Sequence, residues 1–349
     1  MHRQLAAAAV AALALLTACS ASAPAPVVTG STAATPATPK TARATTGAGA
    51  SQSPLPSATA LPTTSTSQSA SQPTAATPAP STGAARELPR GGTAIFPTYR
   101  LVGLCGAPGS AALGRLGVGS LTDRAADADR LATSYAAGRR PMPVLELIAT
   151  VVTAGPGPDG MHRFRQSDET IGRYLAAARQ VNGLLLLNIQ PGRAEFVDEV
   201  RAYERWLLEP DVGVALDPEW AIQAGQTPGR VFGRTTGAEL DAVAAYLSQL
   251  VAANRLPEKA LVYHLLSPSI LVNPAGLQPH PGVAAIVSVD GIGRPAAKTG
   301  TYTKVVGVTP AHVQRGFKLF YDEDAKAGPL MTPVQVLALT PQPAYVMYE

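Results

Sequence analysis

The chain has 349 residues, a formal net charge of +4 and a hydrophobic fraction of 46%, and these averages conceal two unlike parts. Residues 20–85 contain no aromatic residue and only two charges, Lys40 and Arg43, so this stretch cannot bury enough apolar surface to offset the entropy of folding. Residues 86–349 hold all ten Tyr, both Trp and all six Phe. No run of Lys or Arg exceeds two residues, which argues against a nucleic-acid partner.

The N-terminus has the pattern of a bacterial lipoprotein signal. Arg3 supplies a positive charge, and residues 5–16 form an apolar run that is too short for a resident membrane helix. The run ends in Leu-Thr-Ala before Cys19, which resembles the lipobox, whose Cys is acylated and becomes the mature N-terminus. We therefore expect a signal peptide at residues 1–18 and a lipid anchor, including palmitate, on Cys19, at the extracytoplasmic face of the cell membrane. The alternative is an ordinary secretory peptide with an incidental Cys.

Residues 19–90 are rich in Ser, Thr, Pro and Ala, and we expect them to form a disordered tether. Residues 91–349 are numerous enough to bury a full core, and they are the predicted folded domain. If Cys19 carries lipid, Cys105 is the remaining thiol, and no intramolecular disulfide is possible. We interpret Cys105, which ends the first predicted strand with no His nearby, as a packing residue.

Apolar segments of strand length alternate with amphipathic segments of helix length through the predicted domain. Strands are predicted at residues 99–104, 143–151, 183–190, 212–216, 259–265, 284–289, 316–321 and 344–348. Helices are predicted at residues 121–137, 168–180, 195–208, 236–256 and 332–339. No clear long helix is found between the fifth and seventh strands.

This alternation predicts an α/β domain with a parallel sheet and crossover helices. Eight such units in roughly 250 residues match a closed (β/α)8 TIM-like barrel. The alternative is an open doubly wound sheet. That fold usually has fewer strands, and its Gly-x-Gly-x-x-Gly phosphate-binding motif is missing after the first strand.

The fourth predicted strand runs into a pair of acidic residues. Asp217 and Glu219 are two apart, so on an extended chain both side chains face the same way. Glycosidic cleavage needs such a pair, one as acid and the other as nucleophile, base or charge stabiliser. Burial near Trp220 and repulsion from Asp217 would both raise the pKa of Glu219, which suits the acid role. The alternative is a solvated pair at a strand–loop junction.

Other strand ends complete a ring of polar residues where such barrels build their active sites. Asp290, after the sixth strand, is the third candidate catalytic residue. Glu146 and Lys318 lie within apolar strands, and we expect them either to pair with each other or to face substrate. Residues 322–324 are interpreted as a solvated loop. The candidate substrate-binding residues are Glu146, Gln190, Trp220, His264, Tyr321 and Asp322.

No cofactor and no metal are expected. The five His residues show no His-x-His or His-Glu-x-x-His spacing, which disfavours a zinc site, and His264 is interpreted as hydrogen-bonded inside the barrel. A carboxylate site for Mg²⁺ or Ca²⁺, built from Asp217, Glu219 and Asp290, remains open. Gly-x-Ser-x-Gly is absent, so a serine hydrolase elbow finds no support.

Four segments carry a resemblance to known proteins: Glu-Leu-Ile-Ala at 146–149, Gln-Pro-Gly-Arg at 190–193, Leu-Asp-Pro-Glu-Trp at 216–220 and Phe-Tyr-Asp-Glu-Asp at 320–324. They resemble uncharacterised barrel lipoproteins and secreted proteins of high-GC Gram-positive bacteria. The Asp-x-Glu pair is more distantly similar to family 18 and family 25 glycoside hydrolases, whose acid lies there. The longer Asp-x-x-Asp-x-Asp-x-Glu run of family 18 is missing.

The resemblance implies a glycoside hydrolase-like barrel that acts on an envelope or extracellular polysaccharide, such as a cell-wall glycan, with Glu219 as the acid. The alternative is a non-catalytic lipoprotein that binds carbohydrate or the envelope.

Overall fold

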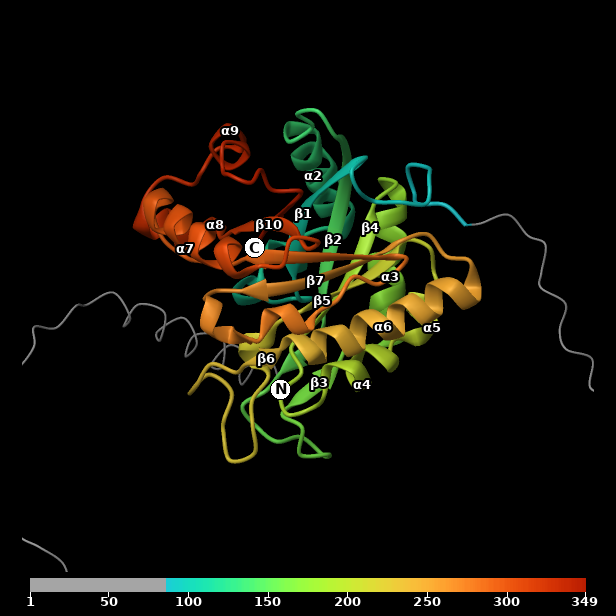
Figure 1. The fold of residues 1–349 in the computed structure, drawn as a ribbon, viewed down its shortest axis with the longest axis vertical. Helices are drawn as coiled ribbons and strands as arrows, with labels where there is room; N and C mark the ends of the chain where they lie inside the picture. The colour runs from blue at the N-terminus through green and yellow to red at the C-terminus, as the bar shows by residue number, and fades with distance from the viewer. Residues whose placement is uncertain (1–85) are drawn as a thin grey trace, which may run out of the picture. The chain divides into compact units, whose positions relative to one another are not determined.

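The computed structural model describes residues 86–349, and within them eight parallel strands close into a barrel (Figure 1). β1 pairs with β2 on one side and with β11 on the other, which closes the ring. The predicted (β/α)8 TIM-like fold is therefore confirmed. The eight strands are β1 (Tyr99–Gly106), β2 (Arg140–Val152), β4 (Leu184–Ile189), β5 (Val212–Leu216), β7 (Lys259–Leu265), β9 (Val283–Val289), β10 (Gln314–Leu319) and β11 (Tyr345–Tyr348).

The predicted signal peptide, the lipidation site at Cys19 and most of the predicted tether lie outside the described residues. The chain already contacts the barrel before residue 91, where the domain is expected to begin. The Arg90 guanidinium donates to the Asp129 carboxylate at 2.6 Å, and Leu88 is buried. Residues 88 and 90 thus pack with the barrel.

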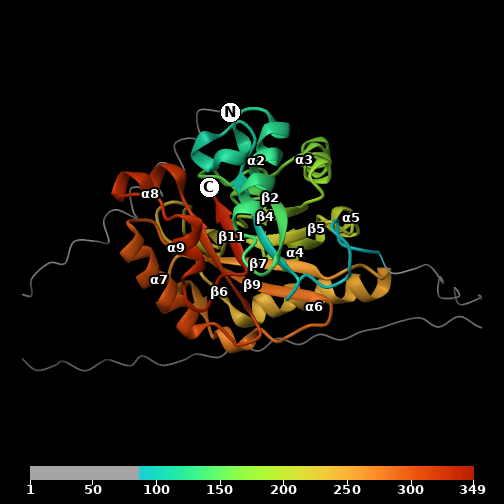
Figure 2. The same ribbon diagram turned by 90° about the horizontal axis from the view of Figure 1, so that it is seen from above.

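Helices cover the outside of the strands (Figures 1 and 2). A capping box formed by Thr236 and Glu239 begins the longest of them. No helix in residues 86–349 has the length and apolar character that a bilayer crossing requires. The helices are α2 (Leu121–Ser134), α3 (Asp168–Gln180), α4 (Phe196–Arg201), α5 (Glu204–Leu207), α6 (Gly237–Asn254), α7 (Pro295–Val308), α8 (Tyr321–Ala327) and α9 (Pro333–Leu337).

Three helical regions differ from the prediction. The helix expected at residues 195–208 is divided into α4 and α5. α7 was not predicted because its Gly, Thr and Val residues are poor helix formers and leave only a weak apolar stripe. The predicted solvated loop at 322–324 is wrong, since these residues lie in α8 and Asp324 is buried against Lys298.

The crossover between β7 and β9 contains no α-helix. It consists of two 3-10 turns and the short strand β8 (Leu271–Val272), which pairs with β6 (Thr235–Thr236) after β5. A further strand, β3 (Arg163–Arg165), runs antiparallel to the end of β2. β3 and the pair β6–β8 are additions that the periodicity did not predict.

Strict alternation along the strands divides the side chains into two layers. One set packs between the sheet and the helices, and the other fills the barrel interior. Deep in the interior the inward positions are apolar, for example Leu101, Met142 and Val262. Towards the carboxyl ends of the strands the same inward series becomes polar, as in Val144-x-Glu146 and Val262-x-His264. This change builds the site described next.

Candidate active site

Asp217 and Glu219 reach the same cavity, but the chain between them is not extended. β5 ends at Leu216, and Pro218–Trp220 forms a 3-10 turn directly after Asp217. The predicted extended geometry is therefore wrong, because proline starts a turn at this point. The turn brings Glu219 over the end of the barrel. The Asp217 side chain faces the barrel interior, as does that of Ala215 two residues earlier.

The cavity at the carboxyl ends of the strands has a volume of about 120 Å³. Its polar wall contains the three predicted catalytic residues, Asp217, Glu219 and Asp290, together with Gln190. Lys318 and Glu349 are also charged, and aromatic and aliphatic side chains form the rest of the lining. The other lining residues are Ala112, Leu113, Ile148, Trp220, Phe232, Leu266, Ile292, Lys318, Phe320 and Glu349.

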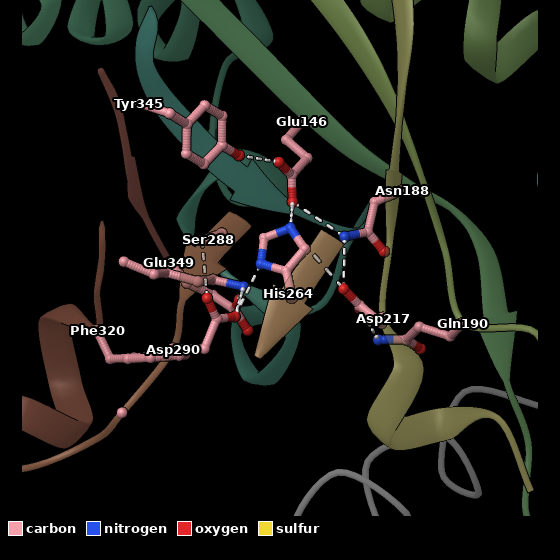
Figure 3. Close-up of polar contacts among 12 residues, drawn as sticks. Glu146, Asn188, Gln190, Asp217, His264, Ser288, Asp290, Phe320, Tyr345 and Glu349 are labelled. Carbon is pink, nitrogen blue, oxygen red and sulfur yellow. Dashed lines mark hydrogen bonds and ion pairs between the residues drawn. The ribbon is translucent and has the colours of Figure 1, made fainter. Parts of the chain in front are cut away.

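Asp290 is held by three polar side chains (Figure 3). Its Oδ1 accepts from the Ser288 hydroxyl at 2.8 Å, and its Oδ2 lies 2.8 Å from Nδ1 of His264. The Lys318 ammonium lies 3.3 Å from the same Oδ2 and 2.5 Å from Oε2 of Glu349. Two cations thus hold one carboxylate at the cavity wall.

His264 lies between two carboxylates. Its Nε2 is 3.1 Å from Oε1 of Glu146, on the side opposite Asp290. Glu146 in turn accepts from Nδ2 of Asn188 at 2.9 Å and from the hydroxyl of Tyr345. These contacts join β2, β4, β7, β9 and β11 across the barrel interior, as the close-up shows (Figure 3).

Amide groups hold Asp217 in place. Nδ2 of Asn188 donates to its Oδ1 at 3.0 Å, and Nε2 of Gln190 donates to its Oδ2 at 3.3 Å. The same Gln190 accepts from the backbone amide of Val152 at 3.2 Å, which fixes its orientation. Glu219 differs, because its Oε2 is enclosed and has no hydrogen-bond partner among the described residues.

The carboxyl groups of the cavity differ in protonation. Burial raises the pKa of Glu219 well above its usual value, and the charges of Asp217 and Asp290 raise it further. Burial also raises the pKa of Asp217, to about 6, against the opposing charges of His264 and Lys318. Burial would raise the pKa of Asp290 as well, but His264 and Lys318 outweigh it and hold that pKa below its usual range. Glu219 is therefore the protonated group and Asp290 the ionised one.

Glu146 and His264 do not lie where substrate contact was expected. Both side chains are fully enclosed beneath the cavity, and neither lines it. The reason is depth, because Ile148 is the next inward residue of β2 and occupies the cavity wall above Glu146. The predicted alternative of a direct Glu146–Lys318 pair is also wrong, since Lys318 pairs with Asp290 and Glu349.

Tyr321 and Asp322 line a neighbouring cavity of about 260 Å³. This cavity shares Ala112, Phe320 and Glu349 with the smaller one, so the two adjoin. The ring of Tyr321 carries the Arg115 guanidinium 4.3 Å from its centre. Two of the predicted substrate-binding residues, Gln190 and Trp220, line the cavity that contains Asp217, Glu219 and Asp290, which we call the acidic cavity. Tyr321 and Asp322 line the adjoining cavity instead.

Phe232 and Glu349 line the acidic cavity but were not predicted. Phe232 belongs to an irregular loop, where periodicity gives no signal. Glu349 is the next inward position after Met347 of β11, so the period of two could have found it. Cys105, expected to pack, is buried in the barrel interior. Within residues 86–349 no group of three or more His, Cys, Asp or Glu side chains is arranged to hold a metal ion.

Comparison with solved structures finds distant likenesses only. No family model matches the sequence, and no curated protein matches it. A crystal structure of a hyperthermophilic endo-β-1,4-glucanase in complex with substrate is similar at a TM-score of 0.35 and 7% identity. The likeness covers 71% of this chain and 88% of that one.

Proposed function

We propose that this protein is a glycoside hydrolase-like enzyme that cleaves an envelope or extracellular polysaccharide by carboxylate acid–base chemistry. The observation that carries the proposal is that Glu219, whose Oε2 is enclosed without a hydrogen-bond partner among the described residues, shares one cavity with Asp290, which His264 and Lys318 contact. The pKa of Glu219 is raised and that of Asp290 is lowered, each by named neighbours. Two carboxyl groups whose environments drive their pKa values apart are the acid and base that such a reaction needs.

In the proposed reaction, Glu219 gives its proton to the glycosidic oxygen as the carbon–oxygen bond breaks. The positive charge that develops on the sugar ring faces the Asp290 carboxylate, which His264 and Lys318 keep ionised. Water then adds its hydroxyl to the sugar carbon. Its remaining proton passes to the Glu219 carboxylate, which restores the acid. Asp217 lies beside both groups and raises the pKa of Glu219.

The shape and lining of the site support a sugar substrate. Trp220 and Phe232 line the acidic cavity with Phe320, and aromatic faces pack against the apolar faces of sugar rings. The acidic cavity is small and adjoins a larger one, so a polymer with sugars on both sides of the cleaved bond fits the pair of cavities. The relation to the barrel lipoproteins of high-GC Gram-positive bacteria remains part of this proposal.

We also propose that Cys19 anchors the protein by lipid to the extracytoplasmic face of the membrane. The signal-like residues 1–18 and the tether-like composition of residues 19–90 support this placement. A domain on a long tether can reach glycans at some distance from the bilayer.

The acid assignment is tested by Glu219→Gln, which keeps the shape of the side chain and removes its proton. Turnover of purified envelope glycans, followed by the release of reducing ends, should fall about 10²- to 10⁴-fold. Glu169→Gln, exposed in α3 and outside both cavities, is the matched control and should retain turnover. If wild-type protein binds a glycan and releases no product, the protein is the carbohydrate-binding lipoprotein instead.

A further inference from the structure

His264 is enclosed on every side, and both of its ring nitrogens face carboxylates. Its side chain has no exposed surface, with Asp290 at 2.8 Å from Nδ1 and Glu146 at 3.1 Å from Nε2. A neutral imidazole carries one proton, so one nitrogen would then present a lone pair to a carboxylate oxygen. Nδ1 is aligned with Asp290 as a hydrogen-bond donor, whereas Nε2 lies close to Glu146 without that alignment, so the charge of the two carboxylates is what favours the imidazolium.

The charges around His264 favour this state. Burial lowers the pKa of His264, but Asp290 and Glu146 outweigh burial and the opposing Lys318, so the pKa lies well above its usual value. Oδ1 of Asp217 is a third carboxylate oxygen, 3.9 Å from Nε2. Glu219 interacts by charge with His264, Asp217 and Asp290. The other ionisable groups of this region face Glu146 or Lys318, and they are Cys105 of β1, Tyr345 of β11 and Glu349.

The orientation of the His264 ring is fixed because Glu146, which lies beside Nε2, is itself held by hydrogen bonds. Glu146 accepts from the Asn188 amide at 2.9 Å and from the Tyr345 hydroxyl, and it is as enclosed as His264 itself. Burial raises the pKa of Glu146, but His264, then Lys318 and the Tyr345 hydroxyl, outweigh burial and lower that pKa to about 2, so Glu146 stays ionised. A fixed anion on one side of the ring therefore aims Nδ1–H at Asp290 on the other.

We infer that His264 is a positioning residue that acts through Asp290: braced by Glu146 and Tyr345, it holds the Asp290 carboxylate ionised and oriented into the cavity. This inference assigns the pair to the support of the site, in place of the substrate contact expected from the sequence. It rests on the proposed function only where turnover is measured. The protonation of the ring and its contact with Asp290 stand without it.

Loss of the imidazolium would leave two enclosed carboxylates, Glu146 and Asp290, with Lys318 as the nearest cation. Such groups take up protons when a neutralising partner is removed. A protonated Asp290 no longer presents a full negative charge to the sugar. The acidic limb of the activity profile should then move to higher pH, while substrate affinity changes little, because His264 does not line the cavity.

The first test is independent of turnover. The purified full chain, labelled with ¹⁵N in its His residues, is titrated from pH 5 to pH 9 and followed by long-range ¹H–¹⁵N spectra. The His264 signals, identified by their loss in His264→Asn, should show both nitrogens protonated at pH 7.5. Asp290→Asn should restore ordinary titration. A wild-type ring that is neutral at pH 7.5 overturns the inference.

The second test uses turnover. His264→Leu should lower kcat/KM about 100-fold, with KM nearly unchanged and the acidic limb shifted upward. His264→Asn retains a donor near the position of Nδ1 and should recover part of the loss. His280→Asn, at a partly buried pair with Asp241 outside the acidic cavity, is the control. A folded His264→Leu protein with a wild-type pH profile overturns the inference, whereas absence of wild-type turnover with a protonated His264 overturns the proposed function alone.

Discussion

The backbone amide of Gly233 donates to the carbonyl oxygen of Glu219 at 2.6 Å. The loop that follows the proposed acid is thus tied back to that residue, and Arg234 adds a second bond to Ala221 at 3.2 Å. A Cβ atom at position 233 would lie 2.2 Å from the Ala221 carbonyl oxygen, so this close approach requires glycine. The loop therefore places Phe232 on the cavity wall beside the acid.

Phe232→Ala should weaken glycan binding about fivefold, since a single aromatic contact contributes on the order of 1 kcal/mol. The chemical step should change little, because the carboxyl groups remain. Binding is measured by calorimetry on the Glu219→Gln background, where no product forms. The control is Val231→Ala, whose side chain is exposed and does not line the cavity. Equal affinities for the two variants would contradict this role of Phe232.

Asp217→Asn should move the alkaline limb of the kcat/KM profile to lower pH. The pKa of Glu219 is raised by burial and then by the negative charge of Asp217, so removing that charge lowers it. The acid must be protonated to act, and it would then lose its proton at a lower pH. Asp241→Asn, outside the cavity, should leave the profile unchanged. An alkaline limb that stays in place would show that Asp217 does not tune Glu219.

Lys298 and Asp324 form an ion pair of 2.9 Å in which each side chain is 2% exposed. Asp324 also accepts from the backbone amides of Gly293 and Phe320, so the pair joins the loop after β9 to α8. Lys298→Met would leave the Asp324 charge buried and unpaired, and should lower the free energy of unfolding by about 3–5 kcal/mol.

Denaturant unfolding measures this loss. The control is Lys304→Met on the exposed face of α7, which should change stability by less than about 0.5 kcal/mol. The double variant Lys298→Met with Asp324→Asn should lose less than the sum of its single changes, because the buried charge is then gone. Additive losses would mean that the two side chains do not act as a pair.

Cys19→Ser should release the protein from the membrane. Serine has no thiol to acylate, so the anchor cannot form. Membrane fractionation and the mass of the N-terminal peptide measure the outcome. Cys105→Ser is the matched control, since its buried thiol lies in the barrel interior, and that variant should stay membrane-bound. Membrane retention of Cys19→Ser would place the anchor elsewhere.

The convergence of Asp217, Glu219 and Asp290 could be predicted because it follows from topology. Parallel strands of a closed barrel bring their carboxyl ends to one mouth, and the strand segments were clear enough to count. The predicted strand at 212–216 and the predicted helix at 168–180 coincide with β5 and α3. The period of two along each strand also separates inward from outward positions.

Depth within the barrel could not be predicted in the same way. Glu146 lies one inward step below Ile148, and that step depends on the stagger between strands, which no single segment encodes. A turn at Pro218 is present in place of the expected extended geometry. The acidic residues after Phe320 lie in a helix, in which Asp324 is buried and paired with Lys298. The depth of Glu146 and the burial of Asp324 depend on residues distant in sequence, whereas the turn follows from Pro218 itself.

The contacts from Glu146 through His264, Asp290 and Lys318 to Glu349 alternate in sign along their whole length. Each cation is shared by two anions. Replacing a single one of these residues by a neutral residue therefore leaves an unpaired charge inside the protein, whereas replacing an adjacent cation and anion together does not. Related sequences should therefore lose an adjacent cation and anion together, and an alignment of them should show covariation between the paired positions.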